Sequence, residues 1–331
     1  MLNIKTLIKF LVVAALLYFM GSKGFLSLTA LQKAFTEWNY MIPAYALLFC
    51  GSFMSMYRWQ FLLRVQKLDL NFAMIVKLSF IGQFFNIALP GAVSGDIVKA
   101  HYVAKSAAGM RAKSFSSIFF DRVIGLSALV LVSMIALLIS QIAGWGLSIP
   151  QSLKIFVYGL GTSVLLGFGY LFLVREHHDP LLMILRKLEK KITLIGSITR
   201  IYEGLREYQN HRKTVFLMIL LSMVTHGMCL SSYVLFCYAL GEHQLPPLGL
   251  FVLMPLAMVV TAIPLAPGGM GTGHAAFLFL LKIMGSDRGA DLFNLILTFQ
   301  VFFGLLGAIV YLRFKSHDPS LNMHNLEAMS K

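Results

Sequence analysis

Two segments that contain proline, glycine and charged residues interrupt long apolar runs in this chain, and they limit what it can fold into. The first is IGQFFNIALPGAVSGDIVKAHYVA at 81–104, and the second is AIPLAPGGMGTGHA at 262–275. Lipid cannot satisfy backbone groups freed by Pro and Gly, so such a break is tolerated only where protein or a water-filled cavity surrounds it. Because ionisable residues at bilayer depth usually mark a site, we expect these segments to form the functional centre.

The composition is typical of a multi-pass α-helical membrane protein. Of the 331 residues 58% are hydrophobic and 13% are charged, and several apolar runs are long enough to span a bilayer. The net charge of +14 comes from basic residues that gather in particular loops, which is typical of cytoplasmic loops and argues against nucleic acid as a partner. Cys50, Cys229 and Cys237 fall within apolar runs, so we interpret them as packing residues.

Hydropathy predicts an all-α fold with six full-length spans and two re-entrant helical hairpins, about eight hydrophobic segments in a single integral membrane domain over 1–331. The expected spans are 10–20, 42–63, 117–142, 154–174, 214–240 and 292–312. The first run resembles a signal peptide but lacks a clear cleavage site, so we expect it to be retained. The basic residues predict a plasma-membrane or inner-membrane protein with both termini in the cytoplasm.

Each interrupted segment predicts one hairpin. Basic residues flank the first segment, so the half-helices 72–89 and 96–105 should enter from the cytoplasm and return to it. The second hairpin, 250–284, should enter from the opposite face, because the loops around it are placed outside by the basic residues after the last span. The order span, hairpin, span then recurs with inverted topology at 42–142 and 214–312, as in many secondary transporters.

The segment 175–213 carries nine Lys or Arg residues and is the most strongly cytoplasmic part of the predicted topology. Its apolar residues recur at spacings of three and four, which predicts an amphipathic helix with a break near Gly196. We expect this helix to lie along the inner headgroups. A cytoplasmic helical hairpin that packs only on protein is the alternative.

The hairpin tips carry the candidate binding residues. A half-helix that begins just after the glycines directs its unpaired N–H groups and positive dipole end toward the protein centre, which suits an anion such as phosphate. The alternative is that Asp96 only caps its helix and pairs with Lys99. We assign substrate binding to Pro90, Gly91, Ser94, Gly95, Asp96, Lys99, Pro267, Gly268, Gly269, Gly271, Thr272 and His274.

Three further ionisable residues, Arg58, Asp121 and Arg122, are candidates for gating or structural roles, and the latter two could pair with residues of other helices. We interpret His226 as a packing residue, whereas His274 is a candidate ligand or proton carrier. No catalytic cluster, metal-like spacing or cofactor motif is expected from these residues.

These motifs resemble the flippase-like family that includes the transmembrane region of lysylphosphatidylglycerol synthases and the YbhN-type membrane proteins. The resemblance covers nearly the whole chain and rests on Arg58 and Trp59, on LPGAVSGDIVKA at 89–100, on DR at 121–122 and on PLAPGGMGTGHAA at 264–276. Where the family motifs carry a glycine and a glutamate, this chain has Ser94 and His274. Longer members append a cytosolic aminoacyl-transferase domain and this chain stops shortly after Arg313, so the resemblance implies lipid translocation rather than lipid synthesis.

We therefore expect a flippase-like lipid translocase, not an enzyme, that moves a phospholipid or polyprenyl-phosphate lipid with an anionic headgroup between leaflets. No nucleotide-binding motif is present, so transport should not need ATP hydrolysis. One alternative is an intramembrane enzyme that acts on lipid phosphates. Another is a non-catalytic membrane subunit of a lipid-modifying or cell-envelope synthesis enzyme. Candidate protein partners are a second copy of the chain and a separate lipid-modifying enzyme.

Overall fold

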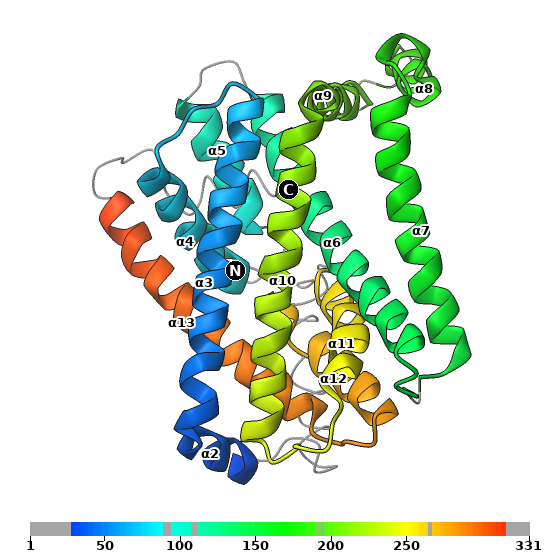
Figure 1. Ribbon diagram of the computed structural model, residues 1–331. Coiled ribbons are helices and arrows are strands. Elements are labelled where there is room, and N and C mark those ends of the chain that lie inside the picture. Colours follow the sequence, from blue (N-terminus) through cyan, green and yellow to red (C-terminus); the bar gives the residue numbers. More distant parts are fainter. Residues whose placement is uncertain are drawn as a thin grey trace.

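The computed structural model describes residues 28–88, 94–106, 111–147, 149–190, 192, 195–263 and 267–315. Within these ranges every regular element is a helix and no strand occurs, which confirms the all-α prediction for this part of the chain. Figure 1 shows the long helices side by side in one bundle, with α8 and α9 at one end and α2 (Leu28–Thr36) at the other.

Five stretches among the described residues are long and apolar enough to cross a membrane. They lie in α3 (Trp38–Val65), α6 (Arg111–Ile142), α7 (Gln151–Leu173), α10 (Arg212–Ala239) and α13 (Gly289–Lys315). These helices correspond to five of the six expected spans. The remaining span, 10–20, lies outside the described residues.

The first interrupted segment forms two short helices, α4 (Phe72–Ala88) and α5 (Ser94–Ser106), which pack against each other. They have 17 and 13 residues, whereas a span needs about 20. Their close approach requires glycine at position 95, because a Cβ atom on Gly95 would lie 2.0 Å from the carbonyl oxygen of Gly82. The tip between the helices, with the candidates Pro90 and Gly91, lies outside the described residues.

The second interrupted segment forms α11 (Pro247–Thr261), the short 3-10 helix η3 (Pro267–Gly269) and α12 (Thr272–Ile283). The turn depends on glycine, since Gly268, Gly269 and Gly271 have φ values of 58°, 72° and 83°, which L side chains rarely adopt. In Figure 1 the α4 and α5 pair lies in the half of the bundle nearer α8 and α9, and the α11 and α12 pair lies in the other half.

Each helix pair is embedded in its own buried apolar cluster. One cluster surrounds α11 and α12 and includes Leu253 and Phe277, while the other surrounds α4 and α5 and includes Ile81 and Val103. Helix α13 packs along α4, and Gly307 permits this approach, because a Cβ atom there would lie 2.1 Å from the carbonyl oxygen of Phe80. Packing on both sides thus holds the short helices inside the bundle.

The amphipathic segment 175–213 forms several short helices rather than one. They are η1 (Glu176–His178), α8 (Pro180–Glu189), α9 (Ile195–Arg206) and η2 (Glu207–His211). The expected break near Gly196 lies just before α9. Helix α9 packs on α6, whereas α8 leaves the apolar side chains Leu181, Met183 and Ile184 exposed. The segment therefore combines packing on protein with exposed apolar side chains, which also include Ile198 of α9.

Candidate functional site

The buried side chain of Arg58 joins three helices next to the first hairpin. Arg58 of α3 donates through Nε and Nη2 to the carboxylate of Asp121 on α6, at 2.7 and 2.9 Å. Its remaining Nη1 donates to Ser222 Oγ of α10 at 2.8 Å. A bidentate arginine fixes its partner in orientation as well as distance, so these contacts set how α3, α6 and α10 face one another.

A second pair ties the hairpin to α6. Asp96, the third residue of α5, accepts a hydrogen bond from Arg122 Nε, while the Lys99 ammonium lies 3.9 Å from the other carboxylate oxygen. Asp96 therefore has a partner on another helix in addition to the expected contact with Lys99. The neighbours Asp121 and Arg122 pair with different helices, as their sequence positions suggested.

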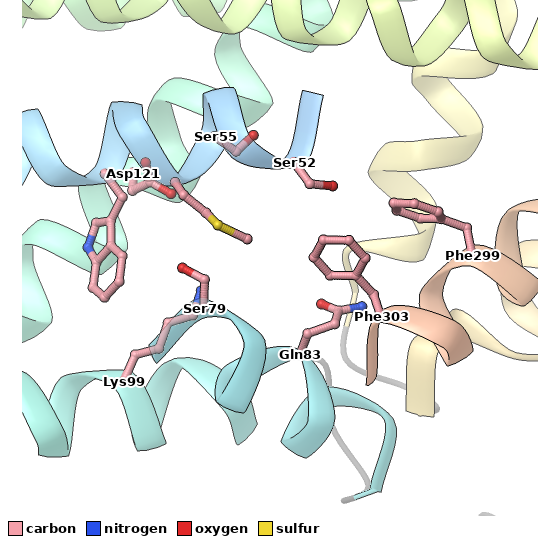
Figure 2. Close-up of a pocket in the computed structure, with 10 residues that line it drawn as sticks. Ser52, Ser55, Ser79, Gln83, Lys99, Asp121, Phe299 and Phe303 are labelled. Atoms are coloured by element: carbon pink, nitrogen blue, oxygen red, sulfur yellow. The ribbon is translucent and has the colours of Figure 1, made fainter. Parts of the chain in front are cut away.

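Beside these ion pairs lies a cavity of about 220 Å³. It is lined by Ser52, Ser55, Met56 and Trp59 of α3, Ser79 and Gln83 of α4, Lys99 of α5, Asp121 of α6, and Phe299 and Phe303 of α13. Figure 2 shows Lys99 and Asp121 toward one end and Phe299 and Phe303 toward the other. The cavity thus has a charged end and an aromatic end, and Ser52 and Ser55 place it near the middle of α3.

Lys99 gives the charged end an excess of positive charge. The three cations Arg58, Lys99 and Arg122 face the two carboxylates of Asp96 and Asp121, and each carboxylate makes its closer contact with an arginine. The Lys99 ammonium lies 5.2 Å from the ring centre of Trp59, a favourable cation–π distance.

Trp59 also lines the cavity, but its indole nitrogen has almost no accessible surface. Its indole N–H is buried and has no hydrogen-bond partner among the residues that the structure describes. A buried N–H group normally has an acceptor, so this N–H is an exception within the protein, and Lys99 is the cavity donor that fits an anionic ligand.

The second hairpin tip is organised differently, because His274 is satisfied within the protein. Its Nδ1 accepts from the backbone N–H of Gly271 at 3.1 Å, so the ring proton is on Nε2, which donates to Asn294 Oδ1 at 2.9 Å. The side chain is 1% exposed and caps the start of α12. Thr272 likewise donates to the carbonyl of Gly269 at 3.2 Å. None of the second-tip candidates lines the cavity that contains Lys99.

Of the first-tip candidates, Lys99 lines the cavity, Asp96 holds α5 against α6, and Gly95 allows α4 to approach. Gly95 also donates its backbone N–H to Asn86 Oδ1 at 2.9 Å, so Asn86 caps α5. His226 bonds to the carbonyl of Gly125 at 2.9 Å, in agreement with a packing part.

Sequence reasoning missed most of the cavity wall. Ser79 and Gln83 are four residues apart, and Ser52 and Ser55 are three apart, so each pair marks a polar stripe on an apolar helix. That spacing could have identified both pairs as cavity-lining residues. Nothing in the sequence distinguishes Phe299 and Phe303 in the same way, because α13 is aromatic at many positions.

Of the cysteines, Cys237 is buried, but Cys50 is exposed and is not the packing residue expected.

Five apolar helices of spanning length, two pairs of shorter helices and a charged cavity at mid-span define a multi-pass helical membrane protein. Residues 6–311 match the family model described as the lysylphosphatidylglycerol synthase TM region, so the chain belongs to this family. It is also similar to UPF0104 membrane protein PH1989 of Pyrococcus horikoshii, with 23% identity over 252 residues, which cover 70% of this chain and 73% of that protein. No solved structure matches the chain. The family resemblance drawn from the motifs is confirmed, and the family is consistent with a lipid-related role in the membrane.

Proposed function

We propose that this protein moves a lipid with an anionic headgroup, such as a phospholipid or a polyprenyl-phosphate lipid, between the two leaflets without hydrolysing ATP. In this proposal it is a translocase and not an enzyme. The observation that carries it is the Lys99 ammonium in the wall of a mid-span cavity, where both neighbouring carboxylates have closer arginine partners.

The remaining lining supports an anionic headgroup. The hydroxyls of Ser55 and Ser79 can donate to phosphate oxygens, whereas the Ser52 hydroxyl donates to the carbonyl of Leu48 at 2.8 Å. Asp121 also lines the cavity, but its bidentate contact with Arg58 offsets its charge. In a medium of low dielectric constant, the excess positive charge of this cluster of three cations and two carboxylates attracts a phosphate much more strongly than it would in water.

The two short helix pairs support alternating access to this cavity. We place both as re-entrant hairpins that enter from opposite faces, within inverted repeats at 42–142 and 214–312. The α4 and α5 pair contributes Ser79, Gln83 and Lys99 to the cavity wall, and α4 also contacts η3 of the second hairpin. Movement of either hairpin would therefore change access to the headgroup site.

We further propose that the chain lies in the cell membrane with both termini in the cytoplasm. The basic segment 175–213 is the main reason, since it places the α8 and α9 end on the cytoplasmic side. The exposed apolar residues of α8 then lie at the level of the inner headgroups. The partners in this proposal are membrane lipids, and no additional protein is required.

Leaflet exchange in liposomes tests the proposal. Purified protein is reconstituted with fluorescent phosphatidylglycerol, and a reducing agent that cannot cross the membrane bleaches the outer leaflet. Because a hydrogen bond to a charged group contributes about 1.5–3 kcal/mol, Lys99→Gln should slow exchange by about tenfold or more. Lys282→Gln is the matched control, since its side chain is 64% exposed and far from the cavity lining.

Exchange by Lys99→Gln at the wild-type rate would contradict the proposal. If wild-type protein exchanges no lipid but co-purifies with a lipid-modifying enzyme and raises its activity, the chain acts instead as a membrane subunit.

A further inference from the structure

A second cavity, almost wholly apolar, lies beside the one that contains Lys99. It has a volume of about 510 Å³, and its walls include Tyr45, Ala46 and Phe49 of α3 and Phe299 and Phe302 of α13. We call it the α3–α13 groove. Phe49 and Phe302 are 41% and 55% exposed, so the groove lies at the outer surface of the bundle, where a spanning protein meets lipid.

One side chain belongs to both cavities. Phe299 lines the α3–α13 groove and also the aromatic end of the polar cavity. Its ring lies 5.1 Å from that of Phe303 in the polar cavity and 6.3 Å from that of Tyr45 in the groove. Figure 2 shows Phe299 at the end of the polar cavity away from Lys99. Phe299 is therefore the wall that the polar cavity shares with the lipid-facing groove.

Polar contacts between Tyr45 and α13 hold one wall of the groove in place. The Tyr45 hydroxyl forms a hydrogen bond of 2.6 Å with Thr298 Oγ1 and donates to the carbonyl of Leu295 at 3.3 Å. Both contacts join α3 to α13. Phe299 follows Thr298 directly and has no such polar group, so its ring can change rotamer without breaking a hydrogen bond.

We infer that the α3–α13 groove binds an acyl chain of the same lipid whose headgroup occupies the Lys99 cavity, with Phe299 at the junction. This inference rests on the proposed function. A charged headgroup joined to an apolar chain matches a charged cavity that shares a wall with an apolar groove. The exposed aromatic rings and the wall shared with a polar cavity together fit an acyl chain, which can remain in contact with the bilayer while its headgroup is inside the protein.

Photo-crosslinking identifies the occupant. Phosphatidylglycerol and phosphatidylcholine that carry the same diazirine in the acyl chain are incorporated into nanodiscs of unlabelled phosphatidylcholine with the wild-type protein. Crosslinks are mapped by mass spectrometry. We expect the phosphatidylglycerol probe to label the groove about tenfold more than the phosphatidylcholine probe. That ratio corresponds to about 1.4 kcal/mol, close to the contribution of one charge-assisted hydrogen bond.

Ala46→Trp fills the groove from an exposed position without touching the polar cavity. It should lower phosphatidylglycerol labelling of the groove about tenfold and leave the binding of glycerol phosphate, a headgroup without chains, unchanged. Val301→Trp is the matched control, because Val301 is 40% exposed on α13 but lies outside the groove. If Ala46→Trp does not fold, Ala46→Leu provides a smaller obstruction and should lower labelling in the same direction.

Equal labelling by the two probes overturns the inference, and so does labelling of the groove that Ala46→Trp does not change. In either case the proposed function still stands if the protein binds glycerol phosphate and Lys99→Gln weakens that binding. If wild-type protein does not bind glycerol phosphate, the proposed function fails and this inference fails with it.

Discussion

At the scale of single residues, the most completely buried ion pair in the described part of the chain lies outside the proposed site. Asp179 is fully buried before α8 and contacts Arg206 Nε at 3.3 Å, with hydrogen bonds from Tyr170 at 2.6 Å and Tyr202 at 2.7 Å. Its carboxylate also accepts the backbone N–H groups of the first turn of α8. Sequence analysis did not single out Asp179, because an aspartate before proline in a basic segment is an ordinary helix cap.

Replacing Asp179 should weaken the whole α7 to α9 junction. Burial acts to raise the pKa of Asp179, but the tyrosine hydroxyls, the Leu182 N–H and the Arg206 charge outweigh it and hold the pKa below the ordinary value. Asp179→Asn leaves the Arg206 charge buried, so it should cost about 3–5 kcal/mol at pH 7.

The pH dependence follows from the lowered pKa. The carboxylate contributes stability above its unfolded-state pKa of about 3.9, and this contribution is lost as pH falls through the lower folded-state pKa. Thermal unfolding in detergent should therefore show a large difference between wild type and Asp179→Asn at pH 7 that shrinks below about pH 4. Asp287→Asn, at a side chain that is 69% exposed, should change little. An equal effect of both variants at pH 7 would contradict this account.

At the scale of elements, the first hairpin depends on backbone contact between α4 and α5. Gly95→Ala places a Cβ atom 2.0 Å from the Gly82 carbonyl oxygen, a backbone atom that can move only if the helices separate. We expect a loss of about 1–3 kcal/mol in stability, and slower lipid exchange, because Lys99 moves with α5. Gly159→Ala is the matched control: it lies in α7 with nothing within 4 Å of a Cβ atom, so stability should not fall. If Gly95→Ala unfolds at the same temperature as wild type, the close contact between α4 and α5 does not contribute to stability and this prediction is wrong.

The helices themselves were largely predictable, because length, hydropathy and breaks at Pro and Gly act locally. The five described spans, the short helices on either side of each break and the helical character of 175–213 all follow from such patterns. The internal hydrogen bonds of His274 were not predictable, since Asn294 is 20 residues away and lies on another helix.

At the scale of the whole molecule, the candidate site could be predicted only in part. The charges of Asp96 and Lys99 inside an apolar run indicated the first hairpin, but the cavity wall also needs α3 and α13, which are far apart in the sequence. Such proximity depends on tertiary packing, for example on the contact of Gly307 with Phe80 that brings α13 against α4. The site therefore combines the first hairpin, which the sequence predicted, with walls from α3 and α13 that only the fold brings to it.

In the proposed function, the positive charge of Lys99 selects the headgroup that enters the mid-span cavity. The most direct measurement is the ratio of leaflet exchange rates for phosphatidylglycerol and for a lipid with a cationic headgroup, measured in the same liposomes with wild type and with Lys99→Glu. Wild type should exchange the anionic lipid faster, and Lys99→Glu should reverse the preference, with each ratio differing from one by about tenfold. The same ratio in wild type and Lys99→Glu would contradict the claim.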